Sequence, residues 1–120
     1  MFYAEKDNGA FFNNHRIRVS KKNDVDDCLF ATGGKVEKEI DLTYRKSGCA
    51  ALDMAYVASG RFDGYFQNNL NLLDIAAGII LVNEAGGVLN EIDLSVNKNI
   101  KIVASSTNIN LKLLEKLYNF

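Results

Sequence analysis

The chain has 120 residues, 48% of them hydrophobic, which suits one small domain with a genuine core. Its formal net charge of −1 argues against a basic nucleic-acid patch or a polybasic membrane anchor. No apolar run reaches the roughly 18 residues of a membrane-spanning helix, and the first residues lack a signal-peptide layout. Cys28 and Cys49 lack metal-ligand spacing, so we expect two reduced, buried thiols in a cytoplasmic protein.

The first part of the chain is predicted to form short strands separated by polar turns. Alternating and apolar runs predict strands over residues 2–5, 10–12, 16–19 and 28–32, the first two joined as a hairpin. Residues 20–27 are predicted to be a loop. The charged segment 35–44 is weakly patterned, and we interpret it as a frayed turn of helix.

The second part of the chain alternates helices and strands. A helix over 49–59 is predicted to bury Ala51, Leu52, Ala55 and Tyr56. A strand over 62–66 leads into a polar loop over 67–71, and further strands are expected over 88–92 and 100–104. A closing helix is expected to begin at Thr107 or Asn108 and to turn Leu111, Leu114 and Leu117 inward. Interleaved strands and helices predict a layered α/β fold.

The most informative stretch, residues 73–87, reads as a helix that is apolar nearly all round and therefore buried. Asp74 stands at its start, where an aspartate is either an N-cap or a ligand, and the pattern alone favours the cap. Glu84 lies in the last turn, which disfavours an acid, so we expect a partner for it. Gly86 and Gly87 supply a left-handed stop.

Two linked motifs in this stretch carry a family resemblance. Asp74-Ile75-Ala76-Ala77-Gly78, followed by Glu84-Ala85-Gly86-Gly87, resembles the C-terminal signature of the inositol monophosphatase family. Residues 47–64 are similar to the family's substrate-side helix and strand, and residues 4–20 to the hairpin before its second half. The resemblance covers nearly the whole chain and is strongest to bacterial members, including the SuhB-type proteins.

The resemblance implies a fold and an activity. The expected fold is a layered α/β sandwich, the C-terminal lobe of the inositol monophosphatase fold, with residues 1–120 as one domain and the N-terminal metal-binding lobe absent. The implied activity is Mg²⁺-dependent hydrolysis of a small phosphorylated polyol such as inositol-1-phosphate. The resemblance makes Asp74 a metal ligand near the substrate, and places Gly48, Cys49 and Ala50 along the inositol phosphate. Gln67 stands where the family has a glutamate for a sugar hydroxyl.

Departures from the family pattern predict that the chain is inactive alone. The Asp-Pro-Ile/Leu-Asp-Gly-Thr motif that carries most of the metal ligands is missing, and the chain contains no proline. Mg²⁺ prefers octahedral oxygen coordination, so Asp74 is one ligand of several that the ion needs. Leu72-Leu73 replaces the usual Pro-Trp. The segment between residues 32 and 47 is short by most of one helix, which is expected to uncover part of the sheet.

Three hypotheses follow. The first is a half-enzyme that is inactive alone and is completed by an N-terminal lobe or by a homodimer. The second is a non-catalytic remnant or interaction module of a SuhB-like protein, related to transcription or RNA or binding a protein, without direct contact to nucleic acid. The third is a plain α/β domain in which Asp74 is a cap. Asp53 is interpreted as part of a solvated helix face, and Asp63 as a partner in a turn. Arg45 and Lys46 are interpreted as a solvated pair.

Overall fold

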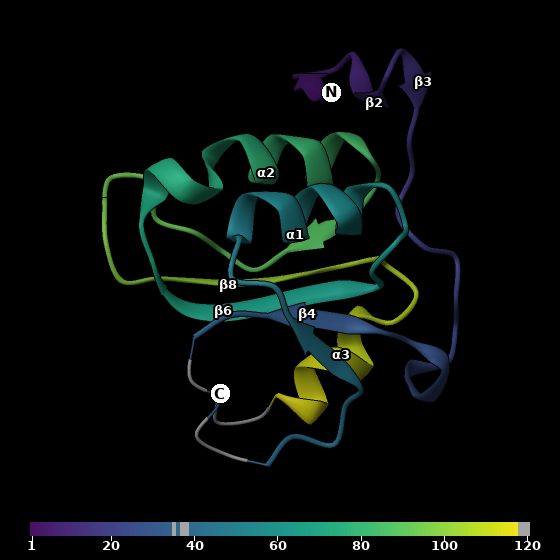
Figure 1. Ribbon diagram of the computed structural model, residues 1–120, viewed down its shortest axis with the longest axis vertical. Coiled ribbons are helices and arrows are strands. Elements are labelled where there is room, and N and C mark those ends of the chain that lie inside the picture. Colours follow the sequence, from purple (N-terminus) through teal and green to yellow (C-terminus); the bar gives the residue numbers. More distant parts are fainter. Residues whose placement is uncertain (35, 37–38, 118–120) are drawn as a thin grey trace.

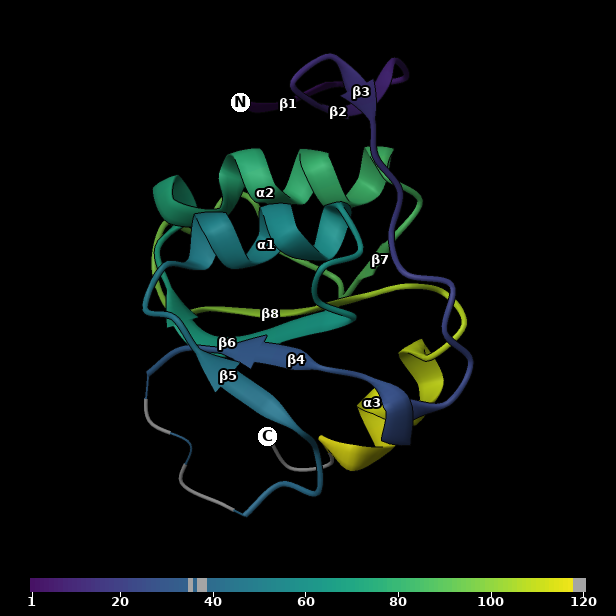
Figure 2. The same ribbon diagram turned by 45° about the vertical axis from the view of Figure 1, so that its right-hand side comes forward.

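A computed structural model describes residues 1–34, 36 and 39–117. In this part of the chain two sheets and three α-helices stack in layers (Figure 1). The helices α1 (Ala50–Ala58) and α2 (Leu72–Glu84) cover one face of the larger sheet, and α3 (Asn110–Lys116) lies on the other face. The smaller sheet lies beyond α2 (Figure 2). The predicted layered α/β fold is confirmed.

The larger sheet has the strand order β5-β4-β6-β8-β7. Its strands are β4 (Phe30–Thr32), β5 (Tyr44–Lys46), β6 (Gly64–Leu70), β7 (Val88–Leu89) and β8 (Ile100–Ser105). β4 runs parallel to both β5 and β6, whereas β8 is antiparallel to β6 and β7. The parallel strands therefore end at one edge, where α1 and α2 begin.

The smaller sheet is an antiparallel arrangement of β1 (Phe2–Glu5), β2 (Gly9–Phe12) and β3 (His15–Arg16). Arg61, in the turn after α1, attaches it to the helix layer. Its guanidinium lies 5.1 Å from the ring centroid of Phe12 and 5.0 Å from that of Tyr56, which is cation–π range.

Glu84, at the end of α2, holds the turn of the β1–β2 hairpin. Its two carboxylate oxygens accept hydrogen bonds from the backbone amides of Asp7 (2.9 Å) and Gly9 (2.8 Å). These amides lower the pKa of the Glu84 carboxyl. The predicted partner of Glu84 is thus confirmed as the hairpin backbone. Gly86 supplies the left-handed stop with φ +89°, whereas Gly87 does not have a positive φ.

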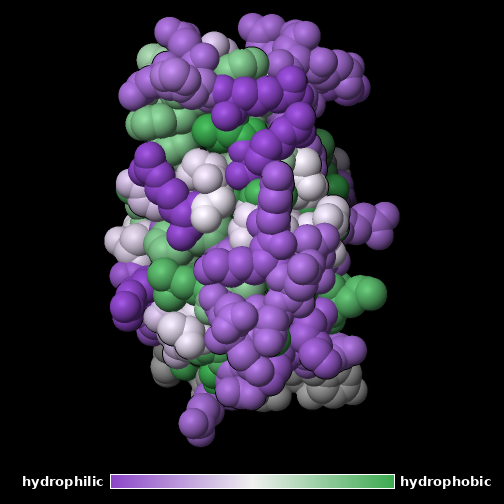
Figure 3. Space-filling model, turned by 90° about the vertical axis from the view of Figure 1, so that its right-hand side faces the viewer, coloured by the Kyte–Doolittle hydropathy of each residue, from purple (hydrophilic) through white to green (hydrophobic). Residues whose placement is uncertain are grey.

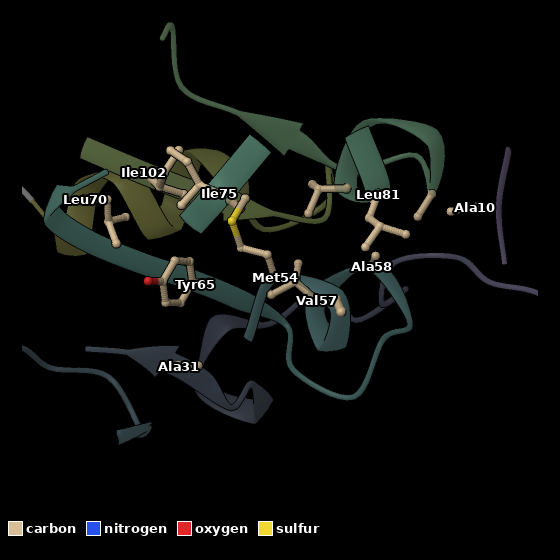
Figure 4. Close-up of a cluster of buried hydrophobic side chains, with 14 of the residues drawn as sticks. Ala10, Ala31, Met54, Val57, Ala58, Tyr65, Leu70, Ile75, Leu81 and Ile102 are labelled. Atoms are coloured by element: carbon tan, nitrogen blue, oxygen red, sulfur yellow. The ribbon is translucent and has the colours of Figure 1, made fainter. Parts of the chain in front are cut away.

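The main core lies between the helix pair and the larger sheet (Figure 4). Met54 of α1 stands at its centre, with Ile75 of α2 and Tyr65 of β6 around it, and all three are fully buried. Gly78 permits this packing, because a Cβ there would lie 2.7 Å from the Cβ of Met54. The crossing of α1 and α2 thus depends on one glycine.

A second core lies under the opposite face of the sheet, where α3 packs. Its buried members are Val25, Cys28, Phe30, Phe66, Val103, Ile109, Leu113 and Leu117. Ile40, Leu42 and Tyr44 pack against this cluster from the shortened segment. The described part of that segment therefore covers apolar surface that was expected to be uncovered. A polar segment joins β3 to the short 3₁₀ turn Val25–Asp27, along a face that is mainly hydrophilic (Figure 3).

Several predicted elements need correction. The frayed turn of helix expected over residues 35–44 is absent from residues 36 and 39–43, and Tyr44 begins the edge strand β5; residues 35 and 37–38 of the segment lie outside the described residues. β6 continues to Leu70, so Gln67 lies on a strand instead of in a loop, because it pairs with Ile102 of β8. The third predicted strand, over residues 16–19, shares only Arg16 with β3, which spans His15–Arg16. Tertiary pairing overrides the local polar composition at these positions.

The predicted helix faces were partly wrong. α1 buries Asp53, Met54, Ala55, Val57 and Ala58, whereas Leu52 is 40% exposed. α3 begins at Asn110 without a side-chain cap, buries Leu113 and Leu117, and exposes Leu111 and Leu114. Cys28 is buried as expected, but Cys49 is exposed. In each helix the packing against α2 or the sheet selects the buried side.

α2 is not buried all round. Leu73 is 94% exposed, and Ala76, Ala77 and Ile80 are exposed along the same helix. Ile75, Gly78, Leu81 and Val82 form its buried side. The exposed residues recur at the spacing of one helix face, so they form one exposed apolar side of α2. No helix within the described ranges is long and apolar enough to cross a membrane.

Candidate functional site

An open pocket of about 440 Å³ lies at the edge where the parallel strands end and the helices begin. In open α/β sheets, ligands bind beyond the carboxyl ends of the strands. The pocket is lined by Gly33, Gly34, Gly48, Cys49, Ala50, Ala51, Gln67, Leu70, Leu73 and Asp74. All five residues that the sequence analysis singled out are therefore brought together here: Gly48, Cys49, Ala50, Gln67 and Asp74.

Asp74 lies in the first turn of α2, but it does not cap the helix. Asn71 occupies the N-cap position, and the Asp74 backbone amide donates to the Asn71 carbonyl at 3.1 Å. The cap interpretation is thus wrong, because the helix begins two residues before Asp74. Within the described part of the chain, no hydrogen bond or ion pair engages the exposed Asp74 carboxylate. It is available to a ligand in the pocket.

The segment before α1 forms the opposite wall. Gly48 has φ +81°, a left-handed conformation that favours glycine. Cys49 follows at the N-cap position of α1, and its backbone amide donates to Ser47 Oγ at 3.2 Å. The first amides of a helix have no intrahelical partner, and together with the helix dipole they favour an anion.

Gln67 closes the pocket from the sheet side. The buried Tyr65 hydroxyl donates to its Oε1 atom, which fixes the amide group from behind. Gln67 also lies against Gly33, where a Cβ would collide with the same oxygen. The glycine at the end of β4 therefore leaves room for Gln67. Burial raises the pKa of the Tyr65 phenol, so this hydroxyl remains a donor.

Asp53, interpreted as part of a solvated face, is instead only 1% exposed. Its Oδ1 atom accepts a 2.6 Å hydrogen bond from Ser47 Oγ, while Oδ2 has no partner among the described residues. Burial raises the pKa of this carboxyl, and the Ser47 hydroxyl acts in the opposite direction. Sequence reasoning missed this residue because the burial depends on how α1 packs on the sheet.

Charged residues elsewhere have structural or solvent-facing positions. Asp63, 2% exposed, accepts hydrogen bonds from the Leu29 amide (2.7 Å) and from Lys22 Nζ (3.1 Å), so it holds the turn before β4. Arg45 and Lys46 are exposed on β5. None of these residues lines the pocket.

The described residues do not form a complete magnesium site. In the described ranges, no group of three or more His, Cys, Asp or Glu residues is placed to hold one metal ion. The pocket lining contains a single carboxylate, that of Asp74. Because Mg²⁺ prefers an octahedron of oxygen ligands, these residues offer one protein ligand and leave the rest to other groups.

Comparison with curated proteins identifies close relatives. The chain is 35% identical to the inositol-1-monophosphatase of Caulobacter vibrioides, over 98% of this chain and 53% of that protein. It is 39% identical to the Nus factor SuhB of Escherichia coli K12, over 76% of this chain and 40% of that protein. The Caulobacter match spans 136 positions, more than the 120 residues of this chain, so that relative carries extra residues within the matched region.

Solved structures of related proteins have a similar fold. The Thermotoga maritima IMPase superposes with a TM-score of 0.84 at 36% identity, over 98% of this chain and 51% of that chain. The extragenic suppressor protein suhB from Bartonella henselae superposes with a TM-score of 0.83 at 39% identity, over 98% and 53% of the two chains. The chain thus spans about half the length of these relatives. The sequence model of the inositol monophosphatase family matches residues 1–119, and the chain belongs to this family.

Proposed function

We propose that this chain is the C-terminal, substrate-side half of a Mg²⁺-dependent phosphatase for small phosphorylated polyols. Asp74 supplies one metal ligand, Gly48, Cys49 and Ala50 line the phosphorylated substrate, and Gln67 contacts a sugar hydroxyl. The observation that carries the proposal is the unpaired Asp74 carboxylate, which shares one pocket with the other four residues in a member of the inositol monophosphatase family.

The pocket chemistry suits a phosphomonoester. Its wall at the start of α1 offers helix amides and the positive end of a helix dipole, both of which favour an anion. Its other wall places one carboxylate, Asp74, at the start of α2. An anionic substrate beside a carboxylate needs a cation between them, and a divalent metal ion stabilises a transferring phosphoryl group.

The remaining metal ligands must come from outside these 120 residues. We propose a complementary lobe of the same family, for two reasons. The chain spans about half the length of its relatives, so a lobe of similar size completes them. The exposed apolar side of α2, formed by Leu73, Ala76, Ala77 and Ile80, lies on the helix that carries Asp74. A lobe that covers this side therefore reaches the pocket.

The test is reconstitution. The 120-residue chain is combined with the part of the Caulobacter relative that lies outside the match, and phosphate release from inositol-1-phosphate is followed as MgCl₂ is titrated. We expect Mg²⁺-dependent release that needs both components. A mixture that associates but releases no phosphate would reject the proposal, and so would release by either component alone at the same rate.

A second candidate is a non-catalytic interaction module. It is favoured by the relatives called Nus factor SuhB and by the almost fully exposed Leu73. Gln67, which replaces a carboxylate, also fits a site that has lost its chemistry. The same experiment separates the two candidates, because an interaction module associates with a partner through α2 without any Mg²⁺-dependent turnover.

A further inference from the structure

A short chain of hydrogen bonds connects the buried base of α1 to the wall of the pocket. Asp53 Oδ1 accepts from Ser47 Oγ at 2.6 Å, and Ser47 Oγ accepts from the Cys49 amide at 3.2 Å. The Asp53 amide in turn donates to the Cys49 carbonyl at 3.0 Å. The Ser47 hydroxyl and the first turn of α1 therefore hold Cys49 from both of its backbone groups.

Little else holds this wall in place. Gly48 adopts φ +81°, and an added Cβ there would meet no heavy atom within 4 Å. Ser47, Gly48 and Cys49 are all exposed. With almost no packing around these residues, their conformation depends on hydrogen bonds, and Ser47 provides the side-chain hydrogen bond from the segment to the buried Asp53 carboxylate.

Burial of the Asp53 carboxylate lowers the stability of the fold. It is 1% exposed, its Oδ2 atom has no partner in the described part of the chain, and it is not among the residues that line the pocket. A buried carboxylate with one unsatisfied oxygen reduces stability, and an apolar side chain would avoid that cost. Among the described residues, the Asp53 carboxylate accepts its hydrogen bond from Ser47.

We infer that Asp53 and Ser47 are a positioning pair that fixes the Ser47–Ala50 backbone in the form that binds the phosphorylated substrate. The inference rests on the proposed function and adds two residues to it. Asp53 acts through Ser47, and Ser47 acts through the Cys49 amide. Neither residue touches the metal ligand Asp74, so the pair affects substrate binding and leaves the metal requirement unchanged.

The variants are Ser47→Ala, Ser47→Thr and Asp53→Asn, with Ser59→Ala as the matched control. Ser59 donates its hydroxyl to the Tyr56 carbonyl at the other end of α1. Amide hydrogen exchange of Cys49 is measured in the 120-residue chain. KM, kcat and the Mg²⁺ concentration for half-maximal rate are measured with inositol-1-phosphate after reconstitution with the complementary lobe.

Loss of one hydrogen bond that is worth about 1 kcal/mol changes an equilibrium by about fivefold. Ser47→Ala is expected to speed Cys49 exchange and to raise KM by about this factor, with kcat and half-maximal Mg²⁺ within about twofold. Ser47→Thr keeps the hydroxyl and Asp53→Asn keeps the Oδ1 acceptor, so both retain a KM near that of the unchanged chain. Ser59→Ala is expected to change neither the Cys49 exchange rate nor KM.

Three results would overturn the inference. Unchanged Cys49 exchange in Ser47→Ala shows that the pair does not hold the backbone. Faster exchange with an unchanged KM shows that the pair is structural only. If the chain without any substitution gives no phosphatase activity after reconstitution, the proposed function is rejected. The role of the pair in substrate binding is then rejected too, whatever the exchange rate of Cys49.

Discussion

Replacing Asp74 with asparagine separates a metal ligand from a structural residue. The side chain is exposed, accepts no hydrogen bond within the described residues, and lies in the first turn of α2 after the N-cap position of Asn71. The change keeps the shape and removes the charge. The one stabilising interaction lost is with the helix dipole, worth about 0.3–1 kcal/mol. Thermal unfolding should therefore shift by no more than about 4 °C.

The catalytic effect of Asp74→Asn should be far larger. Removing even an outer-shell partner of a metal ligand costs about 10- to 100-fold, so loss of the ligand itself should lower the Mg²⁺-dependent rate by more than about a hundredfold. Calorimetry of the chain and a Mg²⁺ titration of the reconstituted enzyme measure the two effects. Glu91→Gln, which removes an exposed carboxylate outside the pocket, is the control.

Two outcomes would refute the reasoning about Asp74. An unchanged rate and an unchanged Mg²⁺ requirement in Asp74→Asn would show that the carboxylate is not a ligand. Unfolding of the variant at a much lower temperature, by well over about 4 °C, would show that the side chain holds α2 in place through contacts that its exposed position does not suggest.

Three further predictions concern the packing and the pocket wall. Gly78→Ala should lower the free energy of unfolding by about 1–3 kcal/mol in urea, because the new Cβ overlaps Met54; equal or higher stability would contradict the observed helix crossing. Glu84→Gln should release the β1–β2 hairpin. Because the pKa of Glu84 is lowered in the folded chain, its contribution exists above the carboxyl pKa of the unfolded chain and disappears as the pH falls through the folded value. The difference between the two proteins in hairpin amide exchange should therefore shrink in acid, and a constant difference would argue against the charge. Gln67→Glu keeps an acceptor for the Tyr65 hydroxyl, so the fold should survive while KM for inositol-1-phosphate falls; a raised KM would remove Gln67 from the substrate contacts.

The sequence predicted the layered fold because it depends on strong local signals. Turn residues and apolar runs marked most strands, and the glycine after α2 marked its end. The motif residues around Asp74 and Gly48 lie far apart in the chain. Their meeting in one pocket followed from the family resemblance, since no spacing rule places the starts of α1 and α2 side by side.

The errors share one physical cause. Asp53 was interpreted as exposed, and Leu111 as buried, because helical periodicity gives the width of a buried face without its direction. That direction is decided by partners distant in the sequence, such as Gly78 opposite Met54. Gln67 was placed in a loop for a similar reason, since pairing with β8 extends a strand through a polar run. Contacts of this kind belong to the tertiary structure, so local sequence patterns do not predict them.

The central claim is that these residues form one half of a composite metal site. Its most direct measurement is phosphate release from inositol-1-phosphate by the 120-residue chain and the complementary lobe, titrated with MgCl₂ and compared with Asp74→Asn. The account predicts Mg²⁺-dependent release that requires both components and is lost in the variant. Stable association of the two components without Mg²⁺-dependent release, or equal release with Asp74→Asn, would contradict it.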